Sequence, residues 1–418
     1  MLNTLNRYNF KKSIDKIIYF ILVLLSFYPL LTTNKISILI LLLFSFSILF
    51  KLDVIKDNFK SYGIKPLIIN SLFYIVIAFS LSYSPLKEKG LDIIVRNISF
   101  LLAPLIFIYS IKIPPKVIRI ISGVFILSNI IVFLYFVFRL GLLSKFMSNP
   151  EEFFNIRFFI EIGKSDYKDW HPTYMSINYL LSILMILKEV KESRKYLKKV
   201  LSLTLVAVFF VFLIILNSRT IIFLTLLAIP TYSILIFKSK RIKILILLSS
   251  VASFLLFSQI SKSNNVGRLF LEPISYNSDN FNLERVLGPR YHIQKCSIDL
   301  ISERPFFGYG IGYEKRLLPS YCLEINNFKN QYLNNYSSHN VYLSTLFASG
   351  ILGLLPLLFM LSNNILLAFR KRSFLYGIVL IIFAFAFLTE NYFIRLNGVV
   401  LFSFINAYFF SLIFKKIE

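Results

Sequence analysis

Long runs of apolar residues, separated by short polar segments, form the dominant pattern along this chain. A helix of about 20 apolar residues crosses the roughly 30 Å hydrocarbon layer of a bilayer. The pattern predicts twelve membrane-spanning helices, and the two short runs 97–112 and 374–389 leave a count of eleven or thirteen open. The predicted spans cover residues 14–33, 35–52, 64–84, 97–112, 118–142, 171–188, 197–217, 219–237, 243–261, 340–362, 374–389 and 397–414.

Two longer polar segments, 143–170 and 262–339, interrupt this alternation. Ordered loops of such length usually carry function. Within the second loop, residues 290–301 place apolar and polar positions at helical spacing, which predicts a helix on the membrane surface. Pro305 and the glycines that follow it then predict a turn. The predicted fold is all-α, a single membrane domain over residues 1–418 with a loop and a larger cap on its outer side.

Composition agrees with a membrane protein. Hydrophobic residues make up 56% of the chain and aromatic residues 17%, more than a water-soluble fold can bury. The formal net charge of +25 would fit a nucleic-acid-binding protein, but the basic residues lie in short clusters between apolar runs. We therefore expect membrane lipids, and no nucleic acid, as partners.

The positions of Lys and Arg predict the orientation of the chain. With the N-terminus inside, the cytoplasmic segments hold 26 of these residues and the short outward loops hold six. The other 14 lie in the two long loops, which cross the membrane largely regardless of charge. We expect both termini in the cytoplasm and the long loops outside. No cleavage site follows the first apolar run, so we expect it to remain as an anchor.

The outward face gathers the candidate chemistry. His339 begins the span 340–362 behind Ser337 and Ser338, either of which can cap the helix. The positive partial charge of a helix N-terminus favours a neutral imidazole, and a neutral ring can accept a proton. His171 begins an earlier span in the same way, and it either contacts a substrate or caps its helix at the interface.

Three arginines can bind an anion at the same face. Arg219 lies in a tight turn between two spans with little other charge around it. A guanidinium at this depth needs an anion or water, so Arg219 either binds an anion or reaches the lipid headgroups. Arg285 and Arg290 flank a Gly-Pro pair in the long loop, where they either join the same positive site or remain solvated charges.

Two further observations concern the outward loops. Cys296 and Cys322 both lie in the second loop, where a disulfide would contribute on the order of 3 kcal/mol, and the sequence leaves the bridge and two free thiols open. The loops lack paired aspartates, a His/Cys cluster at metal spacing and a phosphate-binding glycine loop. We expect no metal and no nucleotide cofactor, so the energy for a reaction must arrive in the substrate.

Several motifs occur in a distinctive order. They are "SRT" at 218–220, "RYHIQKCSIDLISERPFFGYGIG" at 290–312, "HNVYLSTLFASGILG" at 339–353 and "HPTY" at 171–174, with the long outward loop before the tenth span. Together these elements resemble the O-antigen ligase and polymerase superfamily. Its members are polytopic bacterial glycosyltransferases that act on polyprenyl-diphosphate-linked glycans.

The resemblance implies an enzyme with assigned residues. Arg219 and Arg290, with Arg285 and His171, would hold the diphosphate and offset its growing charge. His339 would act as general base on the acceptor hydroxyl, or orient it, in a metal-independent inverting transfer. The donor would be a glycan on undecaprenyl diphosphate and the acceptor lipid A–core or a related molecule. The enzyme would lie in the bacterial inner membrane with its site facing the periplasm.

Two alternatives remain beside an O-antigen ligase. A polymerase that extends the lipid-linked glycan needs the same donor site, although the single dominant loop and the compact "HN" helix start favour a ligase. A transporter or lipid flippase generally has ionisable residues near the middle of the bilayer and inverted repeats. In this chain the polar residues gather at one face instead.

Overall fold

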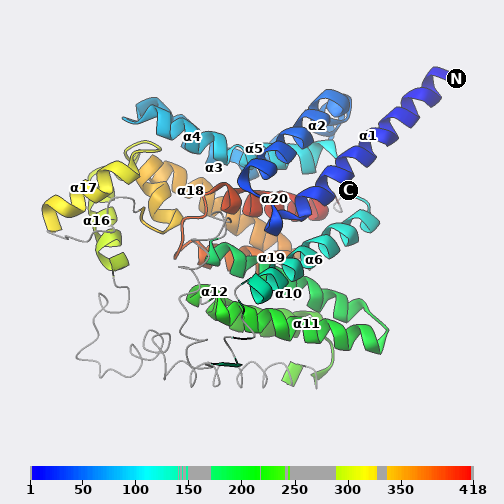
Figure 1. Cartoon of the computed structure of the whole chain (residues 1–418). Helices are drawn as coiled ribbons and strands as arrows, with labels where there is room; N and C mark the ends of the chain where they lie inside the picture. The colour runs from blue at the N-terminus through cyan, green and yellow to red at the C-terminus, as the bar shows by residue number, and fades with distance from the viewer. Residues whose placement is uncertain are drawn as a thin grey trace. The chain divides into compact units, whose positions relative to one another are not determined.

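The computed structural model of the chain is built from helices (Figure 1). It describes residues 2–139, 141, 144, 147–148, 171–216, 218–240, 243–244, 289–326 and 337–415. All regular secondary structure in these ranges is helical, which confirms the predicted all-α fold. The predicted loop 143–170, the span 243–261 and the part of the long loop with Arg285 lie outside the described residues, apart from isolated positions.

Eight helices of the described ranges are long and apolar enough to cross a membrane, which agrees with the predicted polytopic membrane protein. They cover Thr33–Tyr62, Lys65–Tyr83, Lys87–Ser110, Pro115–Arg139, Tyr196–Ile215, Arg219–Ile236, Val341–Arg370 and Leu396–Phe414. A shorter apolar helix, Phe374–Ala386, follows the predicted span 374–389.

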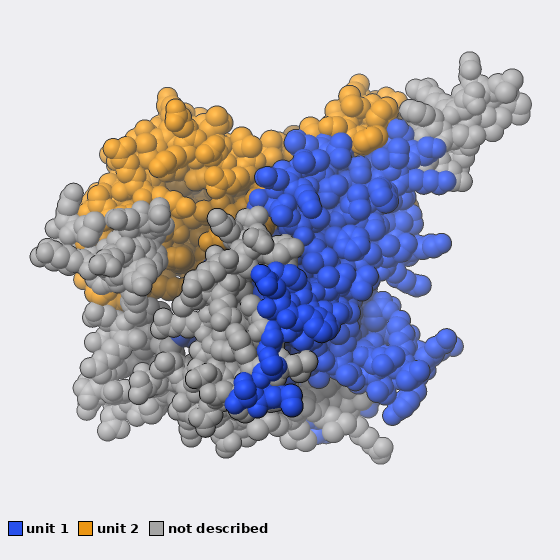
Figure 2. Space-filling view, in the orientation of Figure 1, with its two compact units in different colours: residues 1–43, 113–281 blue, residues 44–112, 282–418 orange. Residues whose placement is uncertain are grey.

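The chain divides into two compact units, each formed by two separate stretches (Figure 2). Unit 1 contains residues 1–43 and 113–281, and unit 2 contains residues 44–112 and 282–418. This division does not test the prediction of one membrane domain over residues 1–418, which stays a prediction.

Unit 1 is organised around a buried helix, α10. Its elements are α1 (Leu2–Ser26), η1 (Tyr28–Leu30), the start of α2 (Thr33–Tyr62), α6 (Pro115–Arg139), α10 (Pro172–Glu192), α11 (Tyr196–Ile215) and α12 (Arg219–Ile236). The hydroxyl of Tyr179 in α10 donates to the carbonyl of Asn129 in α6 at 2.9 Å, and the Asn129 amide donates to Ser182 Oγ at 3.1 Å. Such bonds hold helices together where apolar packing alone cannot distinguish protein from lipid.

Unit 2 combines a helical bundle with a cap of two further helices. Its elements are the end of α2, α3 (Lys65–Phe79), η2 (Ser80–Tyr83), α4 (Lys87–Asn97), α5 (Ser99–Pro104), η3 (Leu105–Ser110), α16 (Pro289–Glu303), α17 (Glu314–Asn326), α18 (Val341–Arg370), α19 (Phe374–Ala386) and α20 (Leu396–Phe414). Helix α18 packs against α3 and α19, and α20 packs against α5.

Three buried asparagines connect the bundle helices of unit 2. The Asn364 amide in α18 donates to Asn70 Oδ1 in α3 at 2.9 Å and to Asn406 Oδ1 in α20 at 3.0 Å. The Asn406 amide donates to Asn70 Oδ1 at 2.9 Å, and the Tyr376 hydroxyl from α19 donates to Asn406 Oδ1 at 2.7 Å. Because each amide meets a partner, the network links four helices without leaving a buried polar group unsatisfied.

Helix α18 is broken at Gly350, where φ is +61° and ψ is −157°. L side chains rarely adopt this conformation, and a Cβ at Gly350 would collide with the backbone of Phe306. The break leaves backbone groups in the middle of a helix without helical partners. In a membrane protein such groups need partners from the protein itself.

The turn 305–310 supplies these partners. The Tyr309 amide donates to the Phe347 carbonyl at 2.7 Å, and the Ile351 amide donates to the Pro305 carbonyl at 2.8 Å. The predicted turn after Pro305 is therefore confirmed, and it also completes the hydrogen bonding of α18 on both sides of the break.

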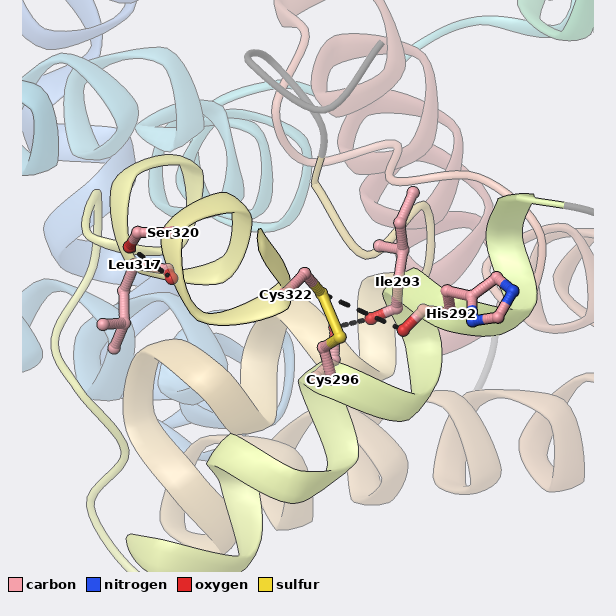
Figure 3. The surroundings of a disulfide bond; sticks show 7 residues. His292, Ile293, Cys296, Leu317, Ser320 and Cys322 are labelled. Carbon is pink, nitrogen blue, oxygen red and sulfur yellow. Dashed lines mark hydrogen bonds between the residues drawn. A yellow bond between two sulfur atoms is a disulfide. The ribbon is translucent and has the colours of Figure 1, made fainter. Parts of the chain in front are cut away.

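A disulfide joins the two helices of the cap (Figure 3). Cys296 in α16 and Cys322 in α17 have Cα atoms 5.8 Å apart and are separated by 26 residues. The bridge lies in a buried apolar cluster with Ile293, Leu318 and Phe347, the last of which belongs to α18. The structure thus resolves the question that the sequence left open in favour of the bridge. Helix α16 confirms the predicted helix, and its position on the membrane surface stays a prediction.

Candidate functional site

His339 immediately precedes the residue that caps α18. Asn340 is the N-cap, and its side-chain oxygen accepts hydrogen bonds from the amides two and three residues later, at 2.8 and 3.1 Å. The prediction that Ser337 or Ser338 caps this helix is wrong, because the helix begins at Val341 and the cap must directly precede it.

The backbone of His339 has φ of +49°, in the left-handed region that non-glycine residues seldom occupy. Glu314 of α17 holds the segment in this conformation from one side. Its carboxylate accepts from the Ser338 amide at 2.8 Å and from the Ser344 hydroxyl at 2.5 Å. Backbone conformations of this kind are common at functional sites, where the surrounding structure enforces them.

A buried carboxylate lies beside the His339 ring. Glu390, in the turn after α19, has its Oε1 atom 3.4 Å from His339 Nδ1. A carboxylate at Nδ1 orients the ring and favours the tautomer that carries its proton there. The Nε2 atom is then the proton acceptor of the imidazole. Glu390 was not predicted from the sequence, although it is the one acidic residue between 374 and 414 and lies at the end of an apolar run.

Arg290 reaches the same turn. It is the second residue of α16, it is exposed, and its guanidinium donates to the Thr389 carbonyl at 3.1 Å. Thr389 directly precedes Glu390. The structure therefore brings two predicted site residues, Arg290 and His339, to one short segment at the end of α19.

The other predicted residues belong to unit 1 or lie outside the described ranges. His171 is the N-cap residue of α10, but its side chain makes no capping hydrogen bond, and its ring lies edge-on to Tyr174 at 5.5 Å. Arg219 is the exposed first residue of α12. Helix α10 packs against both α11 and α12. In the sequence α11 lies between the other two and is joined to each by a short connection, so α10 and α12 run in the same direction. His171 and Arg219 therefore lie at the same end of unit 1. Arg285 is not among the described residues.

An apolar groove opens between α18 and α19. It has a volume of about 430 Å³ and is lined by Tyr342, Leu354, Leu358, Ala384, Phe385 and Leu388. At one end of the groove the Tyr342 hydroxyl donates to the Ala384 carbonyl at 2.8 Å. Since Tyr342 is three residues from His339 and Leu388 is two residues from Glu390, the groove starts beside this pair and follows the two helices away from it.

Residues 204–358 match the family model described as O-Antigen ligase. The matched segment contains the motifs at 218–220, 290–312 and 339–353. None of the curated proteins matches the chain. The family match confirms the resemblance that these motifs predicted.

Proposed function

Because residues 204–358 match the family model described as O-Antigen ligase, we propose that the chain belongs to the O-antigen ligase superfamily and transfers a glycan from a polyprenyl diphosphate to an acceptor hydroxyl. The observation that carries the proposal is the position of His339 within the matched segment, oriented by the carboxylate of Glu390. The reaction that we propose is that of an O-antigen ligase, with undecaprenyl diphosphate as the carrier and lipid A–core or a related molecule as the acceptor.

The reaction is a single displacement. The acceptor oxygen attacks the anomeric carbon from the side opposite the diphosphate, and the carbon–oxygen bond to the diphosphate breaks. The hydroxyl proton passes to Nε2 of His339, which later releases it to water, while the diphosphate leaves with the bonding electrons. Configuration inverts at the anomeric carbon, and no metal takes part.

Cationic side chains offset the charge that grows on the departing diphosphate. Arg290 is suited to this role, because its guanidinium already contacts the turn that holds Glu390. By the family resemblance, we also assign diphosphate binding to Arg219, Arg285 and His171. Guanidinium groups bind phosphoryl oxygens through paired hydrogen bonds, which are stronger in the transition state as charge accumulates.

The groove between α18 and α19 suits the isoprenoid chain of the donor. Its lining is apolar, and it begins at the His339–Glu390 pair, where the diphosphate must lie for transfer. An isoprenoid chain in this groove would keep the donor in the membrane while its glycan stays outside. The protein would then work in the bacterial inner membrane, with both termini in the cytoplasm and the site at the periplasmic face.

A deletion and complementation experiment tests the proposal. Cells that lack the gene should accumulate undecaprenyl-linked polymer and show bare core on a lipopolysaccharide gel, because ligation is lost. Wild-type protein and the control variant His292→Ala should restore the ladder, while His339→Ala should not, at equal protein levels in the membrane. Core carrying a single repeat would instead identify a polymerase, and full complementation by His339→Ala would contradict the assigned base.

A further inference from the structure

Four exposed cations gather in unit 2 on segments that are far apart in the sequence. Lys89 and Arg96 belong to α4, Lys315 belongs to α17, and Arg395 directly precedes α20. Within the described part of the chain, none of the four forms a salt bridge with a carboxylate. Asp92 lies one turn before Arg96 on α4, but its carboxylate forms no salt bridge with Arg96 in the described structure.

Direct contacts bring the four segments together. The Arg96 guanidinium donates to the Ile394 carbonyl at 3.2 Å, which places it next to Arg395. The segment before α17 packs so tightly on α4 that a Cβ added at Gly312 would collide with the backbone of Gly90.

A hydrogen bond fixes the same approach. The Ser84 hydroxyl donates to the Ile311 carbonyl at 2.7 Å, which anchors the segment leading into α17 just before the start of α4. Lys315 is therefore held near Lys89 by backbone packing rather than by any attraction between the two ammonium groups.

The electrostatics of Lys315 report the crowding of positive charge. Loss of surrounding water lowers the pKa of Lys315, and the nearby cations Arg96, Arg395 and Lys89 lower it further, while Glu314 acts in the opposite direction. Glu314 offsets only part of this positive charge, and both its carboxylate oxygens already accept hydrogen bonds from the segment around His339. Like charges held together in this way favour a bound anion.

Helix α4 has the side-chain pattern of a helix at a membrane interface. Leu91 and Val95, which are one turn apart, are 53% and 58% exposed, while Lys89 and Arg96 lie on the other side of the helix. A short helix with exposed apolar side chains on one side and cations on the other is typical of a membrane interface. The anion that fits such a cluster is carried by a lipid.

The cluster also adjoins the proposed catalytic pair. Lys315 follows Glu314, whose carboxylate holds Ser338, the residue before His339. Arg395 lies five residues after Glu390 in the segment that leads into α20. A lipid-borne phosphate at the cluster would therefore have its sugar portion close to the imidazole.

We propose that Lys89, Arg96, Lys315 and Arg395 bind phosphoryl groups of the acceptor glycolipid and so position its hydroxyl for His339. The inference rests on the proposed function and extends it to the acceptor. The donor diphosphate is the leaving group and is bonded to the reacting carbon. Binding of this diphosphate is already assigned to other arginines. Four cations at headgroup depth match an acceptor with more than one phosphate.

The test compares acceptor binding and transfer with and without acceptor phosphates. The variant Lys89→Gln/Lys315→Gln removes two charges whose side chains make no hydrogen bond in the described structure. The control Lys60→Gln/Lys371→Gln removes the same charge from exposed lysines at the opposite end of the unit 2 helices. The probes are lipid A–core from cells without O-antigen and the same glycolipid after chemical removal of its phosphates.

Binding is measured on the purified full chain in neutral detergent, and transfer in phosphatidylcholine liposomes. We expect the test variant to bind the phosphorylated acceptor roughly tenfold more weakly and to show a matching rise in acceptor KM, with kcat nearly unchanged. The dephosphorylated acceptor should bind the wild type and the test variant equally. The control variant should behave as the wild type with both acceptors.

Other results overturn the inference. Unchanged affinity, an equal loss for both acceptors, or a rise in donor KM alone would mean that the cluster does not bind acceptor phosphates. Failure of the proposed function is distinguishable, because a wild type that binds the phosphorylated glycolipid in the expected manner but transfers no glycan would refute the transfer and leave the phosphate site standing.

Discussion

His339 adopts a backbone conformation that costs about 1 kcal/mol or more for a residue with a Cβ. Its neighbours offset this cost: Asn340 caps α18, and Glu314 binds the residues on both sides. The ring is thereby turned toward Glu390, where Nδ1 lies 3.4 Å from the carboxylate.

Removing the charge of Glu390 tests this arrangement. In Glu390→Gln the amide no longer favours the productive tautomer, so kcat should fall roughly tenfold to a hundredfold while donor KM changes little. Glu390→Asp should recover part of the loss, since it keeps the charge. The measurement is the initial transfer rate of purified protein, with Glu192→Gln as a matched control on the exposed end of α10. Wild-type kcat in Glu390→Gln would exclude the orienting role.

At the scale of elements, the break in α18 connects the cap to the bundle. The helix has 30 residues, about 45 Å, which exceeds the hydrocarbon thickness. The 20 residues after Gly350 are sufficient to span it. The turn 305–310 and the disulfide-linked cap helices therefore fasten the segment that begins with His339 to the start of this span.

A methyl group at the break should show how much this connection contributes. Gly350→Ala must adopt a positive φ and displaces the Phe306 backbone, so we expect a loss of at least about 2 kcal/mol in stability and a lower thermal midpoint in detergent. Gly123→Ala is the matched control, because a Cβ there meets no atom within 4 Å on helix α6. Equal thermal midpoints for the two variants would show that the break tolerates a side chain.

At the scale of the whole molecule, the site residues predicted from the sequence motifs fall in both compact units. Arg219 and His171 belong to unit 1, whereas Arg290, His339 and Glu390 belong to unit 2. If Arg219 binds the donor diphosphate, Arg219→Ala should lower transfer at least about a hundredfold without lowering the amount of protein in the membrane. Arg194→Ala, an exposed arginine between α10 and α11, is the control. Full activity of Arg219→Ala would contradict the role proposed for this residue in donor binding.

The sequence by itself determined the class of fold and the family. Apolar runs of about 20 residues can only be satisfied in a membrane, so helices such as α6, α11 and α20 could be predicted from local pattern. The motif order around Arg219, Arg290 and His339 likewise predicted the resemblance to the O-antigen ligase family, whose model matches residues 204–358. These properties depend on composition and order, which the sequence contains directly.

The tertiary structure alone decided which side chains meet. Glu390 lies 51 residues from His339 and the members of the cation cluster are separated by up to 306 residues, so no local pattern connects them. The N-cap of α18 and its break at Gly350 depend on partners in the cap, and the choice between a disulfide and free thiols depends on how α16 packs on α17. Contacts between distant segments arise only when the chain packs, and for this reason the acid beside the imidazole and the cations of α4 and α17 appear only in the folded protein.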